Sequence, residues 1–159
     1  MTSPSSGLLL PYEVELAPLR TAAGEGSRVR VTIGRAPHDR TRWPVRCARI
    51  LLTVPLTHAH PMPLALRTRV TPVASPVHGG QWWVHATTTD PNAPVFTCVP
   101  ETPATFDGTW SLTVTLDLDQ TAADAVEVVE HSTSGDGSLL SHAGRLTATR
   151  HSGPSRSKP

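Results

Sequence analysis

Two histidines one residue apart have the spacing in this chain that most directly suggests chemistry. His58 and His60 form an H-x-H pair inside the proline-rich run 55–63. In an extended segment, two such imidazoles lie on one side and can reach the same metal ion. A site of this kind needs a carboxylate a few residues later, but the next acid after His60 is Asp90. We therefore predict no metal and no other cofactor, and interpret His58 and His60 as surface histidines. If a metal were bound, these two residues would be the candidate ligands.

A pair of tryptophans gives a second candidate site. Trp82 and Trp83 are adjacent, so in a strand they point to opposite faces and one of them belongs to the core. We expect Trp83 to be exposed together with His85, where it would offer a stacking platform to a sugar ring or a peptide. The simpler alternative is that a loop covers Trp83, as happens on the outer face of many sandwiches.

Nucleophilic catalysis has no signature in the sequence. There is no G-x-S-x-G elbow, and no glycine-rich phosphate loop follows a strand and opens a helix. Glu130, His131 and Ser132 include the residue types of a catalytic triad. Because neighbours in a strand alternate faces, His131 should point away from the other two. We assign no catalytic residue and favour a protein that is not an enzyme.

The elements that position these residues should be strands. The 159 residues include 16 prolines and 11 glycines, about one residue in six, which leaves little room for helices. Apolar residues at every second position indicate strands with one buried face. We expect the core to include Trp110, Leu112, Val114, Leu116, Val29, Val31 and Ile33.

The same alternation predicts an all-β fold with little or no helix. We expect about eight to nine strands arranged as a two-sheet antiparallel β-sandwich. The predicted strands cover residues 12–17, 28–33, 47–54, 66–71, 81–88, 95–99, 109–118, 126–132 and 145–150. Residues 12–151 should form one domain, between a flexible segment at 1–11 and a disordered tail at 152–159.

Cys47 falls in the third predicted strand and Cys98 in the sixth, with a turn signal every 8 to 12 residues. In these features the chain resembles bacterial immunoglobulin-like sandwiches over residues 12–151, and a jelly roll is the alternative. The two cysteines could form a pair between the sheets. Because the chain shows no signal peptide or membrane-spanning segment, we expect a cytoplasmic protein without membrane insertion, and therefore reduced cysteines.

Charge is divided along the sequence. Residues 20–69 contain ten arginines and two acids, whereas residues 90–136 contain nine acids and no Arg or Lys. The net charge of +1 argues against nucleic acid as a partner. One interpretation of this division is a charged surface that binds a protein partner or a second copy of the chain. The other is that strands of opposite charge lie side by side and neutralise each other within the fold. Loop residues Arg40 and Arg42 are the basic candidates for partner contact.

No single motif decides the function. Our first hypothesis is a non-enzymatic binding or assembly module that engages a protein partner through a charge-divided surface and long loops. The alternatives are a small bacterial enzyme or ligand-binding protein of secondary metabolism, with a pocket between the sheets, and a carbohydrate-binding module. A bacterial origin fits the use of 13 arginines and a single lysine, which is typical of a GC-rich genome.

Overall fold

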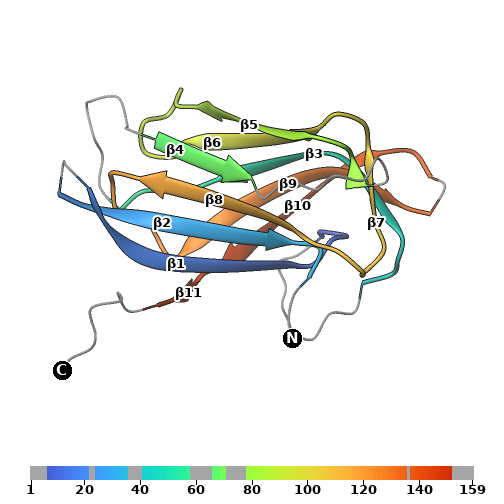
Figure 1. Ribbon diagram of the computed structural model, residues 1–159, viewed down its shortest axis with the longest axis horizontal. Helices are drawn as coiled ribbons and strands as arrows, with labels where there is room; N and C mark the ends of the chain where they lie inside the picture. The colour runs from blue at the N-terminus through green and yellow to red at the C-terminus, as the bar shows by residue number, and fades with distance from the viewer. Residues whose placement is uncertain are drawn as a thin grey trace.

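The computed structural model describes residues 7–21, 24–35, 41–57, 66–70, 78–135 and 137–151, with the backbone alone for 21 and 66–70. Every regular element in these ranges is a strand, and the strands form two sheets packed face to face (Figure 1), which confirms the predicted all-β sandwich. The strands are β1 (Tyr12–Thr21), β2 (Gly24–Ile33), β3 (Val45–Thr53), β4 (Leu66–Val70), β5 (Trp82–Thr87), β6 (Val95–Pro100), β7 (Ala104–Phe106), β8 (Leu112–Leu118), β9 (Ala125–Ser134), β10 (Leu140–Thr147) and β11 (Thr149–Arg150).

Each sheet mixes strands from distant parts of the chain. The five-stranded sheet has the order β11-β1-β2-β8-β4, and the six-stranded sheet has the order β10-β9-β3-β6-β5, with β7 paired to β3. All described pairs of strands are antiparallel except β1 with β11, which is parallel. Strands of the arginine-rich part of the sequence therefore pair with strands of the acidic part in both sheets.

Several strands differ from the sequence prediction. β1 continues to Thr21 and β2 begins at Gly24, while β8 begins at Leu112, so Trp110 lies just before it. The three-residue strand β7 lies between Pro103 and the Asp107-Gly108 turn, and three residues are too few to show a period. The single strand predicted at 145–150 is longer and interrupted, because β10 begins at Leu140 and β11 follows a break at Ala148. β10 is an edge strand whose residues alternate between exposed and half-buried, so it lacks the apolar face that makes a strand visible in a sequence.

The predicted core lies between the sheets as expected. Trp110 is 8% exposed, and the other six predicted core residues are at most 1% exposed. They pack against inward-facing residues of the second sheet, among them Ile50 and Leu52 of β3, Phe96 of β6 and Val128 of β9. Burial of large apolar side chains at about 1.5–3 kcal/mol each is the main source of stability for a sandwich of this size.

The described part of the amino-terminal segment contacts the six-stranded sheet. The Gly7 amide donates to the Ala143 carbonyl at 3.1 Å, and Leu10 is buried. After it, the Gly34 amide donates to the Pro11 carbonyl at 2.9 Å, next to the start of β1. Residues 1–6 and 152–159 lie outside the described ranges, and the domain limits of 12 and 151 stay a prediction.

Candidate binding surface

The structure places some of the predicted site residues and not others. Trp83 and His85 lie on β5, are both exposed, and occupy alternate positions of the strand, so they point to the same side. Arg42 is exposed just before β3, and its carbonyl accepts a hydrogen bond from the Ser134 hydroxyl at 3.3 Å. Arg40, His58 and His60 lie outside the described residues.

The two adjacent tryptophans point in opposite directions, as predicted. Trp82 is 6% exposed, and its indole N–H donates to the His78 carbonyl at 2.8 Å. Trp83 is 42% exposed and points away from the core. Trp82 therefore stabilises the sandwich, and Trp83 is available for contact with another molecule.

Trp83 belongs to a sheet surface that we call the outer face, meaning the side of the six-stranded sheet that points away from the five-stranded sheet. The pairing register places one row of residues straight across this face: His85, Thr97, Leu51, Val129 and Ala143, from β5, β6, β3, β9 and β10. Val129 is 37% exposed, and Leu51 is half-buried. The outer face thus exposes apolar side chains on several strands, as an interface does.

Next to this row, Trp83 is paired with Val99 of β6, which is half-buried. Trp83 and Val129 are two of the three large hydrophobic residues exposed among the described ones, the third being Leu140 at the start of β10 with 60% exposure. The exposed apolar area of the described residues is therefore concentrated on the six-stranded sheet.

Arginines occupy one end of the outer face. Arg46 and Arg49 of β3 are both exposed, and neither forms an ion pair with a described residue. Arg49 is paired in register with His131 of β9, and Arg46 with Thr133 of β9 and Thr105 of β7. We call Arg46 and Arg49 the arginine end.

A surface hollow lies beside Arg46. It has a volume of about 310 Å³ and is lined by Pro44, Arg46, Thr105 and Gly135. Its wall is held by the hydrogen bond from the Gly135 amide to the Pro44 carbonyl at 3.4 Å. The hollow places a cationic side chain where a group from another molecule can reach it.

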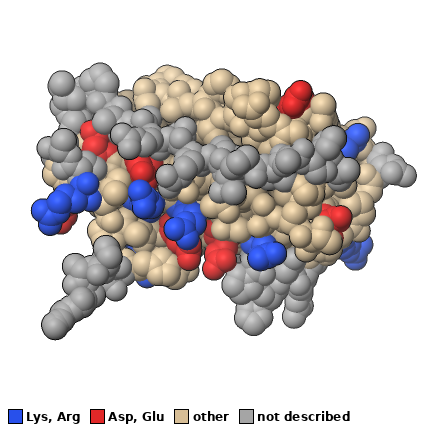
Figure 2. Space-filling model, viewed as in Figure 1, with Lys and Arg blue, Asp and Glu red and all other residues tan. Residues whose placement is uncertain are grey.

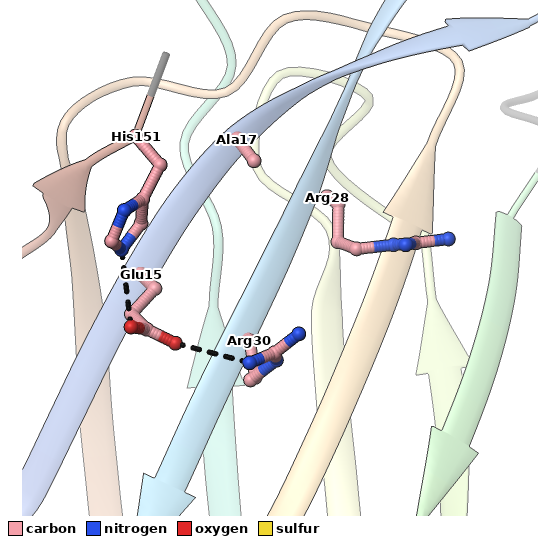
Figure 3. Close-up of a pocket in the computed structure, with 5 residues that line it drawn as sticks. All are labelled: Glu15, Ala17, Arg28, Arg30 and His151. Atoms are coloured by element: carbon pink, nitrogen blue, oxygen red, sulfur yellow. Dashed lines mark hydrogen bonds and ion pairs between the residues drawn. The ribbon is translucent and has the colours of Figure 1, made fainter. Parts of the chain in front are cut away.

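The five-stranded sheet presents a different surface, because several of its described charged side chains form ion pairs. Figure 3 shows the Glu15 carboxylate between His151 and Arg30, at 3.1 Å from His151 Nε2 and 3.4 Å from Arg30 Nη1. These residues line a hollow of about 280 Å³ with Ala17 and Arg28. The Arg28 guanidinium points away from that hollow, toward Asp117 of β8.

Arg150 next to His151 pairs with Asp124. On the face seen in Figure 2, basic and acidic side chains lie side by side and do not form separate patches. Among the described residues, the ion pair between Arg28 and Asp117 joins the arginine-rich part of the sequence to the acidic part.

The run of triad residue types does not form a catalytic site. Glu130 and Ser132 face the interior, where the Ser132 hydroxyl donates to the Glu130 carboxylate at 2.7 Å, while His131 occupies the alternate position. Glu130 is 0% exposed. The same carboxylate accepts hydrogen bonds from the Leu9 amide at 2.6 Å and the Tyr12 hydroxyl at 2.7 Å, and from the Leu10 amide at 3.3 Å.

Glu130 thus joins the amino-terminal segment, β1 and β9 through four donors, with no access from solvent. Burial, followed by the charge of Glu130, raises the pKa of Tyr12 well above its ordinary value. A carboxylate satisfied by neutral donors in this way is a structural anchor.

The cysteines are on neighbouring strands of one sheet, β3 and β6, so the pairing between sheets that the sequence left open is not available to them. Both Cys47 and Cys98 are free and fully buried. Burial raises the pKa of each thiol to about 12, so neither resembles a reactive cysteine.

Within the described ranges, His, Cys, Asp and Glu side chains do not gather in any group of three or more that could hold a metal ion. Nor do those ranges contain a helix long and apolar enough to cross a membrane.

Comparison with known proteins gives only distant similarities. No family model matches the chain, and no curated protein matches it. A cohesin module from a Clostridium perfringens ATCC13124 family 33 glycoside hydrolase has a TM-score of 0.44 and 10% identity, covering 90% of this chain and 98% of its own. AvmM, described as catalysing macrocyclization in alchivemycin A biosynthesis, has a TM-score of 0.41 and 12% identity, covering 89% of this chain and 90% of its own. At these values neither similarity bears on the function of this chain.

Sequence reasoning identified Trp83 and His85 but missed the residues that surround them. Leu51, Arg49 and Val129 lie on strands that the sequence did predict, at positions that alternate with core residues and are therefore marked as outward-facing. Arg46 precedes the predicted strand 47–54, and a bulge between Cys47 and Arg49 lets it point to the same side as Arg49. What the sequence lacks is the strand order that places β9, β3, β6 and β5 side by side.

Proposed function

We propose that this domain is a binding module that docks a protein partner on the outer face of its six-stranded sheet. The observation that carries the proposal is the joint exposure of Trp83 and Val129 on that face. Tryptophan is enriched among the residues that contribute most to protein interfaces, because its ring buries a large area at low entropic cost.

The dimensions of the surface support a protein partner. Five adjacent strands at about 4.8 Å each make the sheet roughly 20 Å wide, which suits an interface of about 800 Å² per partner. Thr97 and Thr53 flank the apolar positions and are half-buried. An apolar centre with polar neighbours is the usual arrangement of an interface.

The other two hypotheses have less support. A ligand or substrate pocket would need room between the sheets, but the inward-facing residues there pack as a continuous core. Three surface hollows lined by described residues have volumes of about 280, 310 and 350 Å³, and each of these three has at most one histidine in its lining. A carbohydrate platform would use Trp83 with His85, but Trp83 is the one exposed tryptophan in the described part of the chain.

Three finer assignments rest on the sequence alone and remain part of this proposal. They are an immunoglobulin-like type for the sandwich, a bacterial origin, and a cytoplasmic location. Arg42 and His85 are proposed to lie at the margin of the interface. Arg40, His58 and His60 are proposed from the sequence alone as further residues that contact the partner.

Site-specific photocrosslinking tests the docking face. A photoreactive phenylalanine derivative placed at position 83 should crosslink to a discrete partner in an extract of the cells that make the protein, whereas the same group at Thr32, on the opposite sheet, should not. Excess unlabelled wild-type protein should suppress the product, and excess Trp83→Ser/Val129→Ser protein should not. Equal crosslinking from positions 83 and 32, or equal suppression by both competitors, would count against the proposal.

A further inference from the structure

The outer face carries an unbalanced charge beside its apolar row. Its strand positions include three arginines, Arg46, Arg49 and Arg145, against one acid, Glu127, which is paired in register with Arg145. On the opposite sheet, Arg28 and Arg30 each have a carboxylate partner. At the arginine end, exposed positive charge adjoins the apolar row and forms no ion pair with a described acid.

The position of these two arginines relates them to the apolar row. Arg49 is two residues before Leu51 in β3, so both side chains point to the same side of the sheet. Arg46 lies three residues before Arg49, across a bulge between Cys47 and Arg49 that lets both point to the outer face. Arg46 lines the hollow of about 310 Å³. A segment lying along β3 would meet apolar side chains first and guanidinium groups next.

We infer that the partner presents an acidic segment, in which apolar residues cover Leu51, Val129 and Trp83 while one or two carboxylates bind the arginine end. This rests on the proposed function and specifies its partner. Guanidinium groups bind carboxylates in a bidentate geometry that an ammonium group cannot reproduce. The hollow beside Arg46 gives one carboxylate a site partly screened from water, where such a contact is stronger than on open surface.

The chemistry also sets the kinetic behaviour of the complex. Charges at the margin of an interface act mainly on the association rate and on its dependence on salt. Association with an acidic segment should therefore slow as ionic strength rises, since the Debye length falls from ~30 Å at 0.01 M to ~8 Å at 0.15 M salt.

Selection from a library of random twelve-residue peptides tests the inference without knowledge of the natural partner. Wild-type protein should enrich peptides that combine apolar residues with Asp or Glu. The Arg46→Glu/Arg49→Glu variant should lose affinity for these peptides at least tenfold at low salt, and should itself select peptides with Lys or Arg. The matched control is Arg20→Glu/Arg35→Glu, with the same change of charge at exposed residues outside the outer face, which should keep the wild-type preference.

The outcomes separate this inference from the proposed function. If wild-type protein selects peptides without acidic excess that lose binding in Trp83→Ser/Val129→Ser, the docking face stands and the acidic partner is wrong. If the selected peptides bind the Trp83→Ser/Val129→Ser variant as well as they bind wild type, the docking face and the acidic partner are both wrong. The inference would also be overturned if the selection yielded no binder. It would be overturned as well if acidic peptides bound the Arg46→Glu/Arg49→Glu variant with the same affinity as wild type.

Discussion

Arg28 and Asp117 face each other across β2 and β8, with Arg28 Nε and Nη2 donating to the two carboxylate oxygens of Asp117 at 2.8 and 3.0 Å. Arg28 comes from the basic part of the sequence and Asp117 from the acidic part. The hydrogen bonds to Asp117 raise the pKa of Arg28 further, so the pair stays charged. The contact shows how a sequence divided by charge folds into a sheet on which opposite charges are neighbours.

Neutralisation within the molecule leads to the first prediction. Sedimentation velocity between 0.01 and 0.15 M salt should detect no association that weakens as salt is added, because ion pairs neutralise Arg28, Arg30, Glu15 and Asp117 on the described part of the five-stranded sheet. A dimer at low salt that dissociates at 0.15 M would contradict this interpretation and restore electrostatic self-association.

The second prediction concerns two tryptophans with different roles. Trp110 is 8% exposed, stacks on Phe106 with ring centres 4.2 Å apart, and donates its N–H to the Thr105 carbonyl at 3.0 Å. Trp110→Ala should lower the free energy of unfolding by ~3 to 5 kcal/mol in urea titrations. Trp83→Ala is the matched control and should change it by less than about 1 kcal/mol. Similar losses in both variants would show that the burial assigned to Trp110 or the exposure assigned to Trp83 is wrong.

The sequence predicted the strands that have a clear period and missed those that do not. Leu112, Val114 and Leu116 alternate with polar residues on an inner strand of the sheet, so its buried side and its carboxyl end at Leu118 were visible, whereas the predicted start at 109 was three residues too early. β7 is too short to show a period, and β10 has an edge position that requires few apolar residues. For such strands, pairing with β3 or β9 supplies the stability that the local sequence does not.

The candidate site was predictable only where one strand contains it. Trp83 and His85 are two residues apart, so alternation alone placed them together. Val129 is 78 positions after Leu51 in the sequence, and only the pairing of β3 with β9 makes them neighbours. Pairing between such distant strands depends on the packing of the whole sandwich, which one sequence does not reveal.

The third prediction concerns the buried carboxylate of Glu130. Glu130→Ala would leave the Tyr12 hydroxyl, the Ser132 hydroxyl and two backbone amides without their acceptor, so stability should fall by about 3 kcal/mol or more. Hydrogen exchange at the Leu9 and Leu10 amides should accelerate more than exchange in β8.

Glu127→Ala is the control for Glu130→Ala, because it removes an exposed acid three residues earlier on the same strand. Glu127→Ala should lower the free energy of unfolding by less than about 1 kcal/mol. If the two variants were equally stable, or if exchange at Leu9 and Leu10 were unchanged in Glu130→Ala, Glu130 would not anchor the amino-terminal segment.

The fourth prediction is a loss of stability at alkaline pH. Burial raises the pKa of Cys47 and Cys98 from 9.0 to about 12, and the pKa of Tyr12 is raised as well. Above pH 9 the unfolded chain releases thiol protons that the folded protein retains. The free energy of unfolding should therefore be unaffected by these groups below pH 9 and fall toward pH 12, by up to about 1.4 kcal/mol per pH unit for each thiol.

Urea titrations at pH 8, 9 and 10 would measure this decline. The Cys47→Ala/Cys98→Ala variant should be less stable at pH 8 but should show a shallower decline between pH 9 and 10, because the contribution of Tyr12 is the same in both proteins. A wild-type slope equal to that of the variant would mean that the thiols are not buried in the folded protein.

Hydroxyl-radical footprinting of the docking face, read by mass spectrometry, tests the central claim most directly. When a partner recovered by photocrosslinking is added, oxidation of Trp83, Leu51 and Val129 should fall severalfold. Oxidation of His151, on the opposite sheet, should stay constant, and the buried Trp82 and Trp110 should react little in either state. Unchanged oxidation of Trp83 and Val129 in the complex, or protection confined to His151 and its neighbours, would contradict the assignment of the outer face as the binding surface.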